Sequence, residues 1–143
     1  MSRLLVEADL VWEEDQRFHA RVGERDFVLD GRKAAGPSPV DVLAAGLACC
    51  MAIDLAHILS KGRQPLKGLR ATLVGGRDET DPKRLRSVDL HFVVAGDVEK
   101  EKVERAIELS RSTYCSVWHS LRQDIEFRTT FEILPGSTAR PRR

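Results

Sequence analysis

Three cysteines are the residues of this 143-residue chain whose chemistry is most distinctive. Cys49 and Cys50 are adjacent in an apolar segment, and Cys115 follows much later in the chain. A thiolate can split the O–O bond of a hydroperoxide and become a sulfenic acid, and a second thiol can then condense with it to a disulfide. Free cysteines are also among the most buried residue types. Both redox chemistry and plain core packing therefore remain open for these thiols.

The charge balance argues against a nucleic-acid partner or an acidic membrane surface. The chain carries 23 Lys and Arg against 22 Asp and Glu, a net charge of +1, which provides no overall field to hold a polyanion. Three cysteines are too few for a secreted disulfide framework. The apolar residues at the start are interrupted by acidic ones, unlike those of a signal peptide: Glu7, Asp9, Glu13 and Glu14. We therefore expect a cytoplasmic protein.

Hydrophobic periodicity predicts an α+β fold in which the elements follow the order β-β-β-α-β-β-α-β. One helix is expected from Pro39 to about Leu59, with Ser38 as its capping residue, and a second is expected to be capped by Asp97. Both long helices should pack on a sheet. Strands are expected at residues 3–12, 17–22, 26–29, 69–73, 87–94 and 125–133.

The length of the chain favours a single domain over residues 1–135. Residues 136–143 contain no apolar anchor and three arginines. We expect them to form a disordered basic tail.

The first predicted helix has no charged or strongly polar side chain from Val42 to Ile53. These twelve residues are fewer than the roughly 18 that a membrane span needs, so we expect a buried central helix and no membrane partner. A small monomer can cover only one side of such a helix with its sheet. The pattern therefore predicts a homodimer that covers the other side.

Several segments between Gly36 and Leu134 form a recognisable set that includes two separate cysteine motifs. They are Gly36-Pro37-Ser38-Pro39, Cys50-Met51-Ala52-Ile53-Asp54, Lys61-Gly62-Arg63-Gln64, Leu90-His91-Phe92, Glu101-Lys102-Val103-Glu104-Arg105-Ala106 and Tyr114-Cys115-Ser116-Val117. Together they resemble the OsmC/Ohr family, and within it the YhfA-like OsmC branch. The resemblance implies an OsmC-like fold and an intertwined homodimer with two thiol sites at the interface. It also implies a peroxidase that reduces organic hydroperoxides without a cofactor.

The resemblance assigns different roles to the cysteines. Cys50 matches the attacking thiol of the family and Cys115 the resolving thiol, which requires their Cα atoms to come within roughly 4.4 to 6.8 Å. Cys49 stands where the family usually has a small residue. Neighbours on a helix point about 100° apart, so Cys49 cannot share the Cys50 pocket, and we expect it to pack in the core.

The resemblance also suggests how the attacking thiol is activated. A buried thiol needs a nearby cation to become a reactive thiolate. Arg17 occupies a place similar to that of an arginine that organises the thiol in the Ohr branch, although an ordinary exposed hairpin arginine is the alternative. The glutamate of that branch is missing, because Val40 stands at its position and Asp41 is rotated by about 100° on the helix.

Two functions follow for the chain. The first is a thiol peroxidase that reduces organic hydroperoxides, with hydrogen peroxide as a further candidate substrate, through a Cys50 sulfenic acid and a Cys50–Cys115 disulfide restored by an unidentified thiol reductant. The alternative is a non-catalytic dimer that binds a hydrophobic small molecule, which the missing glutamate favours. Cys50, Asp54 and His57 share one helical face, but they are too few for a zinc site, so we expect no metal.

Overall fold

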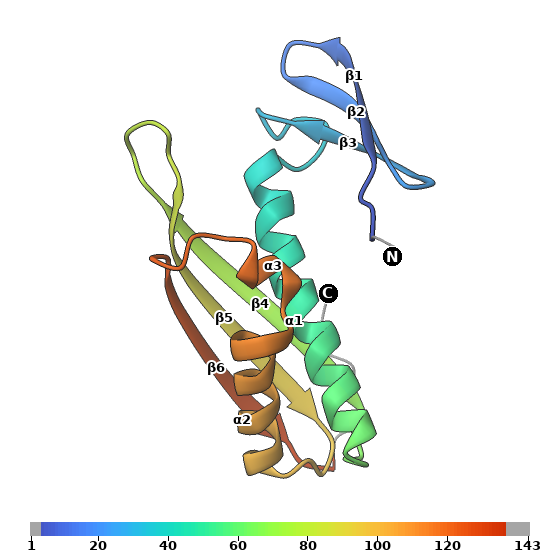
Figure 1. The fold of residues 1–143 in the computed structure, drawn as a ribbon, viewed down its shortest axis with the longest axis vertical. Helices are drawn as coiled ribbons and strands as arrows, with labels where there is room; N and C mark the ends of the chain where they lie inside the picture. Colours follow the sequence, from blue (N-terminus) through green and yellow to red (C-terminus); the bar gives the residue numbers. More distant parts are fainter. Residues whose placement is uncertain (1–3, 137–143) are drawn as a thin grey trace. The chain divides into compact units, whose positions relative to one another are not determined.

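The computed structural model describes residues 4–136 of the chain, so the predicted tail lies almost wholly outside the described residues. The elements follow the predicted β-β-β-α-β-β-α-β order, with two short helical segments added before the last strand (Figure 1). The fold class predicted from the sequence is therefore confirmed. The chain divides into two compact units, with the boundary between Leu43 and Ala44.

The first unit contains an antiparallel three-stranded sheet in the order β1-β2-β3. Its strands are β1 (Ala8–Glu14), β2 (Arg17–Val22) and β3 (Arg25–Asp30). The predicted hairpin at Gly23-Glu24 is confirmed, and Gly23 adopts a φ of +59°, as a type II′ turn requires at its first loop position. The first strand begins at Ala8, where its pairing with β2 starts, so residues 4–7 of the predicted strand lie before it. The predicted start at Arg3 lies outside the described residues.

The loop after β3 is organised by one buried carboxylate. Asp30 is only 3% exposed and accepts hydrogen bonds from the backbone N–H groups of Arg32 and Ala35, at 2.9 and 3.0 Å. These bonds lower the pKa of Asp30. Gly36 closes the loop so near to Val28 that any added Cβ would meet the Val28 carbonyl oxygen. The bonds to Asp30 and the close approach of Gly36 to Val28 therefore hold the loop against β3.

The first helix, α1 (Pro39–Lys61), begins with a reciprocal cap. The Ser38 hydroxyl accepts the Asp41 backbone N–H at 3.1 Å, and the Asp41 carboxylate accepts the Ser38 N–H at 3.0 Å. The pKa of Asp41 is lowered, first by this bond and then by a bond from Lys33. The predicted start of this helix at Ser38-Pro39 is confirmed.

Only one face of α1 is buried within a single chain. The buried side chains recur every four residues and pack on the second sheet: Leu47, Met51, Leu55 and Leu59. The opposite face is exposed, and Ile53 on that face is 62% exposed. The sequence predicts a helix buried on all sides, but a single chain buries only one side of it.

Among residues 4–136, α1 is also the one helix that could span a membrane by length and composition. An 18-residue window of it has a mean hydropathy of 2.1, and this window is longer than the uncharged stretch of twelve residues. The core helix of a water-soluble protein passes the same test. The length and composition of α1 are therefore only weak evidence for a membrane span.

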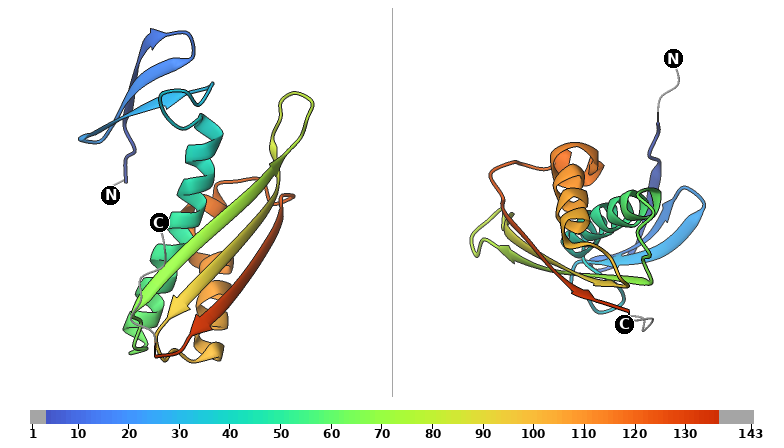
Figure 2. Two further views of the ribbon diagram at one scale, coloured as in Figure 1. Left: turned by 180° about the vertical axis from the view of Figure 1, so that it is seen from behind. Right: turned by 90° about the horizontal axis from the view of Figure 1, so that it is seen from below.

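The second unit is built on a sheet in the order β4-β5-β6. Strand β4 (Gly68–Arg77) pairs antiparallel with β5 (Leu85–Ala95), and β6 (Glu126–Leu134) pairs parallel with β5. A parallel partner needs a crossover connection, which α2 (Lys100–Leu109) supplies. Helices α1 and α2 lie on the same face of this sheet (Figures 1 and 2). The prediction of one sheet is wrong: within the described residues, β1, β2 and β3 pair only with one another, and β4, β5 and β6 form a separate sheet.

The second long helix presents the face that its periodicity predicts. Val103, Ala106, Ile107 and Ser110 are all buried. The predicted cap is wrong: the residue before the helix is Glu99, and its side chain makes no capping bond. Beyond Leu109 the chain widens into a π-helical turn, η1 (Ser110–Tyr114), and after Cys115 it forms one short turn, α3 (Ser116–His119).

Candidate thiol site

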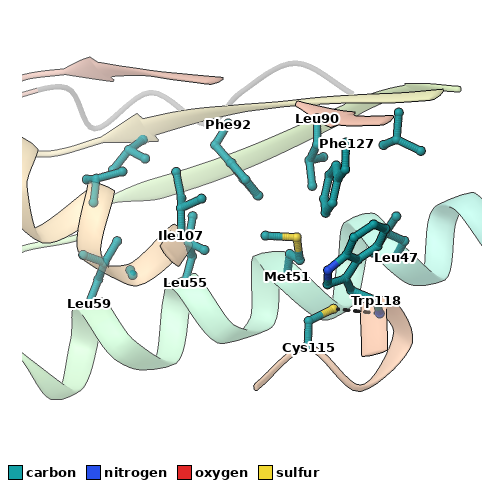
Figure 3. Close-up of a cluster of buried hydrophobic side chains, with 14 of the residues drawn as sticks. Leu47, Met51, Leu55, Leu59, Leu90, Phe92, Ile107, Cys115, Trp118 and Phe127 are labelled. Atoms are coloured by element: carbon teal, nitrogen blue, oxygen red, sulfur yellow. Dashed lines mark hydrogen bonds between the residues drawn. The ribbon is translucent and has the colours of Figure 1, made fainter. Parts of the chain in front are cut away.

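Cys115 lies between η1 and α3, and the backbone at this junction sets its position. Its backbone is extended, with a φ of −71° and a ψ of 100°, and its N–H donates to the Ser110 carbonyl at 2.8 Å. Its sulfur accepts the backbone N–H of Trp118 at 3.3 Å (Figure 3). The π-helical turn thereby directs the thiol into the hydrophobic cluster to which Met51 of α1 also belongs (Figure 3). Single π-turns inside helices are frequent at functional sites.

The structure brings Cys50 and Cys115 together. Cys50 is half-buried on α1, Cys115 is fully buried, and both are free thiols. The pKa of Cys115 is raised to about 11: burial is the main cause, the Cys50 thiol and the charge of Asp54 add to it, and the hydrogen bond from Trp118 opposes them. At neutral pH Cys115 is therefore a protonated thiol.

Asp54 and Ser110 form a polar link between α1 and the turn that carries Cys115. The hydroxyl of Ser110, which is fully buried, donates to the Asp54 carboxylate at 2.7 Å. The carbonyl of the same serine accepts the Cys115 N–H. The helical spacing of Ser110 with Val103, Ala106 and Ile107 predicts only that it lies on the same face of the helix as they do. No local pattern could show its bond to Asp54, because the two residues belong to different helices.

A groove of about 570 Å³ reaches this link from the surface. The residues that line it come from the second half of α1 and from the junction of α2 with η1. They include Asp54, His57, Ile58, Lys61, Leu109 and Tyr114. Among residues 4–136, no three His, Cys, Asp or Glu side chains are grouped to hold a metal ion.

Cys49 does not pack in the core of the described chain, contrary to the expectation from the sequence. It is exposed, because it lies on the side of α1 opposite to Leu47 and Met51. Apolar composition alone could not reveal which face of the helix meets the sheet.

Arg17 lies in β2 of the first unit and is more enclosed than an ordinary hairpin arginine. Its guanidinium is within 3.6 Å of Glu14 and 3.9 Å of the buried Asp30 carboxylate. Its Nε atom is buried and makes no hydrogen bond within the described part of the chain. Asp41 is committed to the helix cap and to Lys33, so it does not replace the glutamate missing at Val40. The role of Arg17 toward the thiols stays a prediction.

The family of the chain follows from comparison with known proteins. A family model described as "OsmC-like protein" matches residues 31–130, which include both thiols and all of α1. The chain belongs to the OsmC-like family. Over 132 residues it is 30% identical to protein YhfA of Escherichia coli, an alignment that covers 90% of this chain and 98% of that protein.

Solved structures share the OsmC-like fold over nearly the whole chain. A hypothetical protein from Aquifex aeolicus is 25% identical, with a TM-score of 0.87, and the match covers 94% of this chain and all of that one. An organic hydroperoxide resistance protein from Legionella pneumophila is 16% identical, with a TM-score of 0.71, and covers 92% and 99% of the two chains. At that identity the second likeness concerns the fold alone.

Proposed function

We propose that the protein is a thiol peroxidase that reduces organic hydroperoxides. The observation that carries this proposal is the pairing of a half-buried thiol, Cys50, with a buried and protonated thiol, Cys115. The more accessible thiol suits attack on a peroxide, and the enclosed one suits the later disulfide step. The hydroperoxide resistance that names the Legionella protein of the same fold supports this assignment.

The reaction balances with these two thiols and a dithiol reductant. Cys50 attacks the outer peroxide oxygen, the O–O bond breaks, and the products are an alcohol and a Cys50 sulfenic acid. Cys115 then attacks the Cys50 sulfur, the S–O bond breaks, and a disulfide and water form. A reductant of the dithiol class restores both thiols and is itself oxidised to a disulfide.

The experiment that tests this proposal measures the loss of cumene hydroperoxide with dithiothreitol as reductant. We expect several turnovers per thiol pair, and faster turnover with cumene hydroperoxide than with hydrogen peroxide, because the helix that carries Cys50 is apolar. Absence of turnover would contradict the proposal.

A binding protein is the second candidate function. Val40 stands where the Ohr branch has its glutamate, and a groove of about 570 Å³ is lined by Asp54, one helical turn after Cys50. A pocket of this size can hold a small apolar ligand without reaction. Retention of a hydrophobic molecule on the purified protein, together with no turnover, would favour this function.

We also propose a cytoplasmic homodimer, with α1 at the interface. The exposed face of α1 supports this assembly: Ala45, Cys49, Ile53 and His57 follow one another at four-residue intervals and face away from the core of their own chain. Free thiols that carry out redox cycles require a reducing compartment, which supports the cytoplasmic location.

Arg17 is the candidate cation that activates Cys50, and its replacement tests that role. In a Cys49→Ser background, Arg17→Ala should lower the rate of Cys50 alkylation by iodoacetamide at neutral pH about tenfold or more, because loss of a nearby positive charge disfavours the thiolate. Arg21→Ala is the matched control, since Arg21 lies on the same strand and pairs with Asp26. Equal alkylation rates in both variants would show that Arg17 is structural.

A further inference from the structure

Asp54 is a carboxylate whose charge acts on the buried thiol, Cys115. It follows Cys50 by one helical turn on α1, so both side chains lie on the same face of that helix. The buried Ser110 hydroxyl holds one carboxylate oxygen at 2.7 Å. The negative charge of Asp54 contributes to the raised pKa of Cys115. The carboxylate is thus fixed between the two helical segments that carry the thiols.

The resolving thiol needs a route for its proton. Cys115 is fully buried and holds its proton tightly, yet it must lose that proton to form a disulfide bond. Asp54 also lines the groove, where His57 and Lys61 are exposed. Asp54 is therefore in place both to accept the proton of the buried thiol and to exchange it with the surface.

We propose that Asp54 accepts the Cys115 proton during disulfide formation and that Ser110 is the positioning residue that holds it there. This inference rests on the proposed disulfide chemistry and adds a residue to it. As the S–S bond forms, the thiol proton moves to the Asp54 carboxylate, and from there to the hydroxide that leaves the Cys50 sulfenic acid as water. When a reductant reopens the disulfide, Asp54 returns a proton to Cys115.

Other charged groups near the pair are less suited to this role. The guanidinium of Arg111 lies over the rings of Trp118 and Phe127, at 5.9 and 4.7 Å from their centroids, and cannot accept a proton. Asp41, also on α1, is held in the helix cap and by Lys33. The other titratable groups on the elements that carry the thiols are exposed: Cys49, His57, Lys61, Tyr114 and His119. The charged groups of α2 are exposed as well: Lys100, Glu101, Lys102, Glu104, Arg105 and Glu108.

The test isolates the resolving step from peroxide chemistry. In a Cys49→Ser background, dithiobis(nitrobenzoate) converts Cys50 to a mixed disulfide and releases one thionitrobenzoate. Attack by Cys115 then releases a second, and the rate of this second release measures resolution. We expect Asp54→Asn to slow the second release on the order of 100-fold at neutral pH, since asparagine can still accept the Ser110 bond but cannot accept a proton.

The pH profile separates a proton acceptor from a structural residue. In Asp54→Asn the rate of the second release should rise about tenfold per pH unit below the pKa of Cys115, because solvent must then remove the proton. The parent protein should show a weaker dependence near neutral pH. Ser110→Ala keeps the backbone carbonyl that binds Cys115 but frees the carboxylate, so its profile should lie between the two. Glu108→Gln removes the same charge from the exposed side of α2 and should behave as the parent.

A purely electrostatic role predicts the opposite sign. The negative charge of Asp54 raises the pKa of Cys115, so its removal alone would favour the thiolate and speed the second release. A rate in Asp54→Asn that equals or exceeds the parent rate would overturn the inference, as would a parent protein that never releases the second thionitrobenzoate. If the parent resolves the mixed disulfide but consumes no hydroperoxide, the proposed function fails while the role of Asp54 remains supported.

Discussion

Cys50→Ser should abolish hydroperoxide reduction, whereas Cys115→Ser should still consume about one equivalent of peroxide per chain and then stop. The first change removes the thiol that attacks the O–O bond. The second leaves this attack intact but removes the thiol that traps the product, so Cys50 should accumulate as a sulfenic acid open to overoxidation. The difference follows from the placement of the two sulfurs, one half-buried and one enclosed.

Mass spectrometry of peroxide-treated protein measures both outcomes. The parent should show a Cys50–Cys115 disulfide, and Cys115→Ser should show one or more added oxygens on Cys50. Cys49→Ser is the matched control: it alters an exposed neighbour on the same helix and should leave both steps intact. A Cys49–Cys115 bridge, or unmodified cysteines with the peroxide intact, would contradict the assignment of the thiols.

Ile53→Glu should convert a dimer into a monomer. Ile53 is 62% exposed in the single chain and lies at the centre of the unpaired face of α1. In a symmetric dimer the change acts once on each copy. An unpaired carboxylate enclosed at an interface costs about 3 to 5 kcal/mol, which weakens association by a factor on the order of 100 to 5000 for each copy.

Light scattering at micromolar concentration measures this change. The parent should have twice the mass of one chain, and Ile53→Glu should have the mass of one. Val74→Glu is the matched control, because Val74 is 66% exposed but lies on β4 rather than α1. The interface proposal would be wrong if the parent were a monomer or if Ile53→Glu remained a dimer. Circular dichroism shows whether each variant is folded.

The order of elements could be predicted because its signals are local. Ser38 and Pro39 mark a helix start through one hydroxyl and one fixed φ, and the structure contains that cap. Residues Arg17–Val22 form a strand with the predicted bounds, since alternation of side chains belongs to the strand itself. The two cysteine motifs indicated the family in the same way, as short patterns in a defined order.

The partners of these elements could not be predicted, because pairing depends on residues far apart in the sequence. Nothing near Val22 or Leu69 indicates that their strands belong to separate sheets. The exposure of Cys49 depends on which face of α1 packs on the second sheet, and a stretch that is apolar on every side does not specify that face.

For the site too, the residue types could be predicted from the sequence, whereas their surroundings depend on the tertiary structure. The sequence by itself determined that Cys50 and Cys115 are the candidate redox pair, since their residue types and motifs suffice for that. Only the tertiary structure decided that Cys115 is enclosed, with its pKa raised to about 11, and that Ser110 holds Asp54 beside it. Burial and hydrogen bonds between helices set these properties, and both arise only when α1 packs against the turn that follows α2.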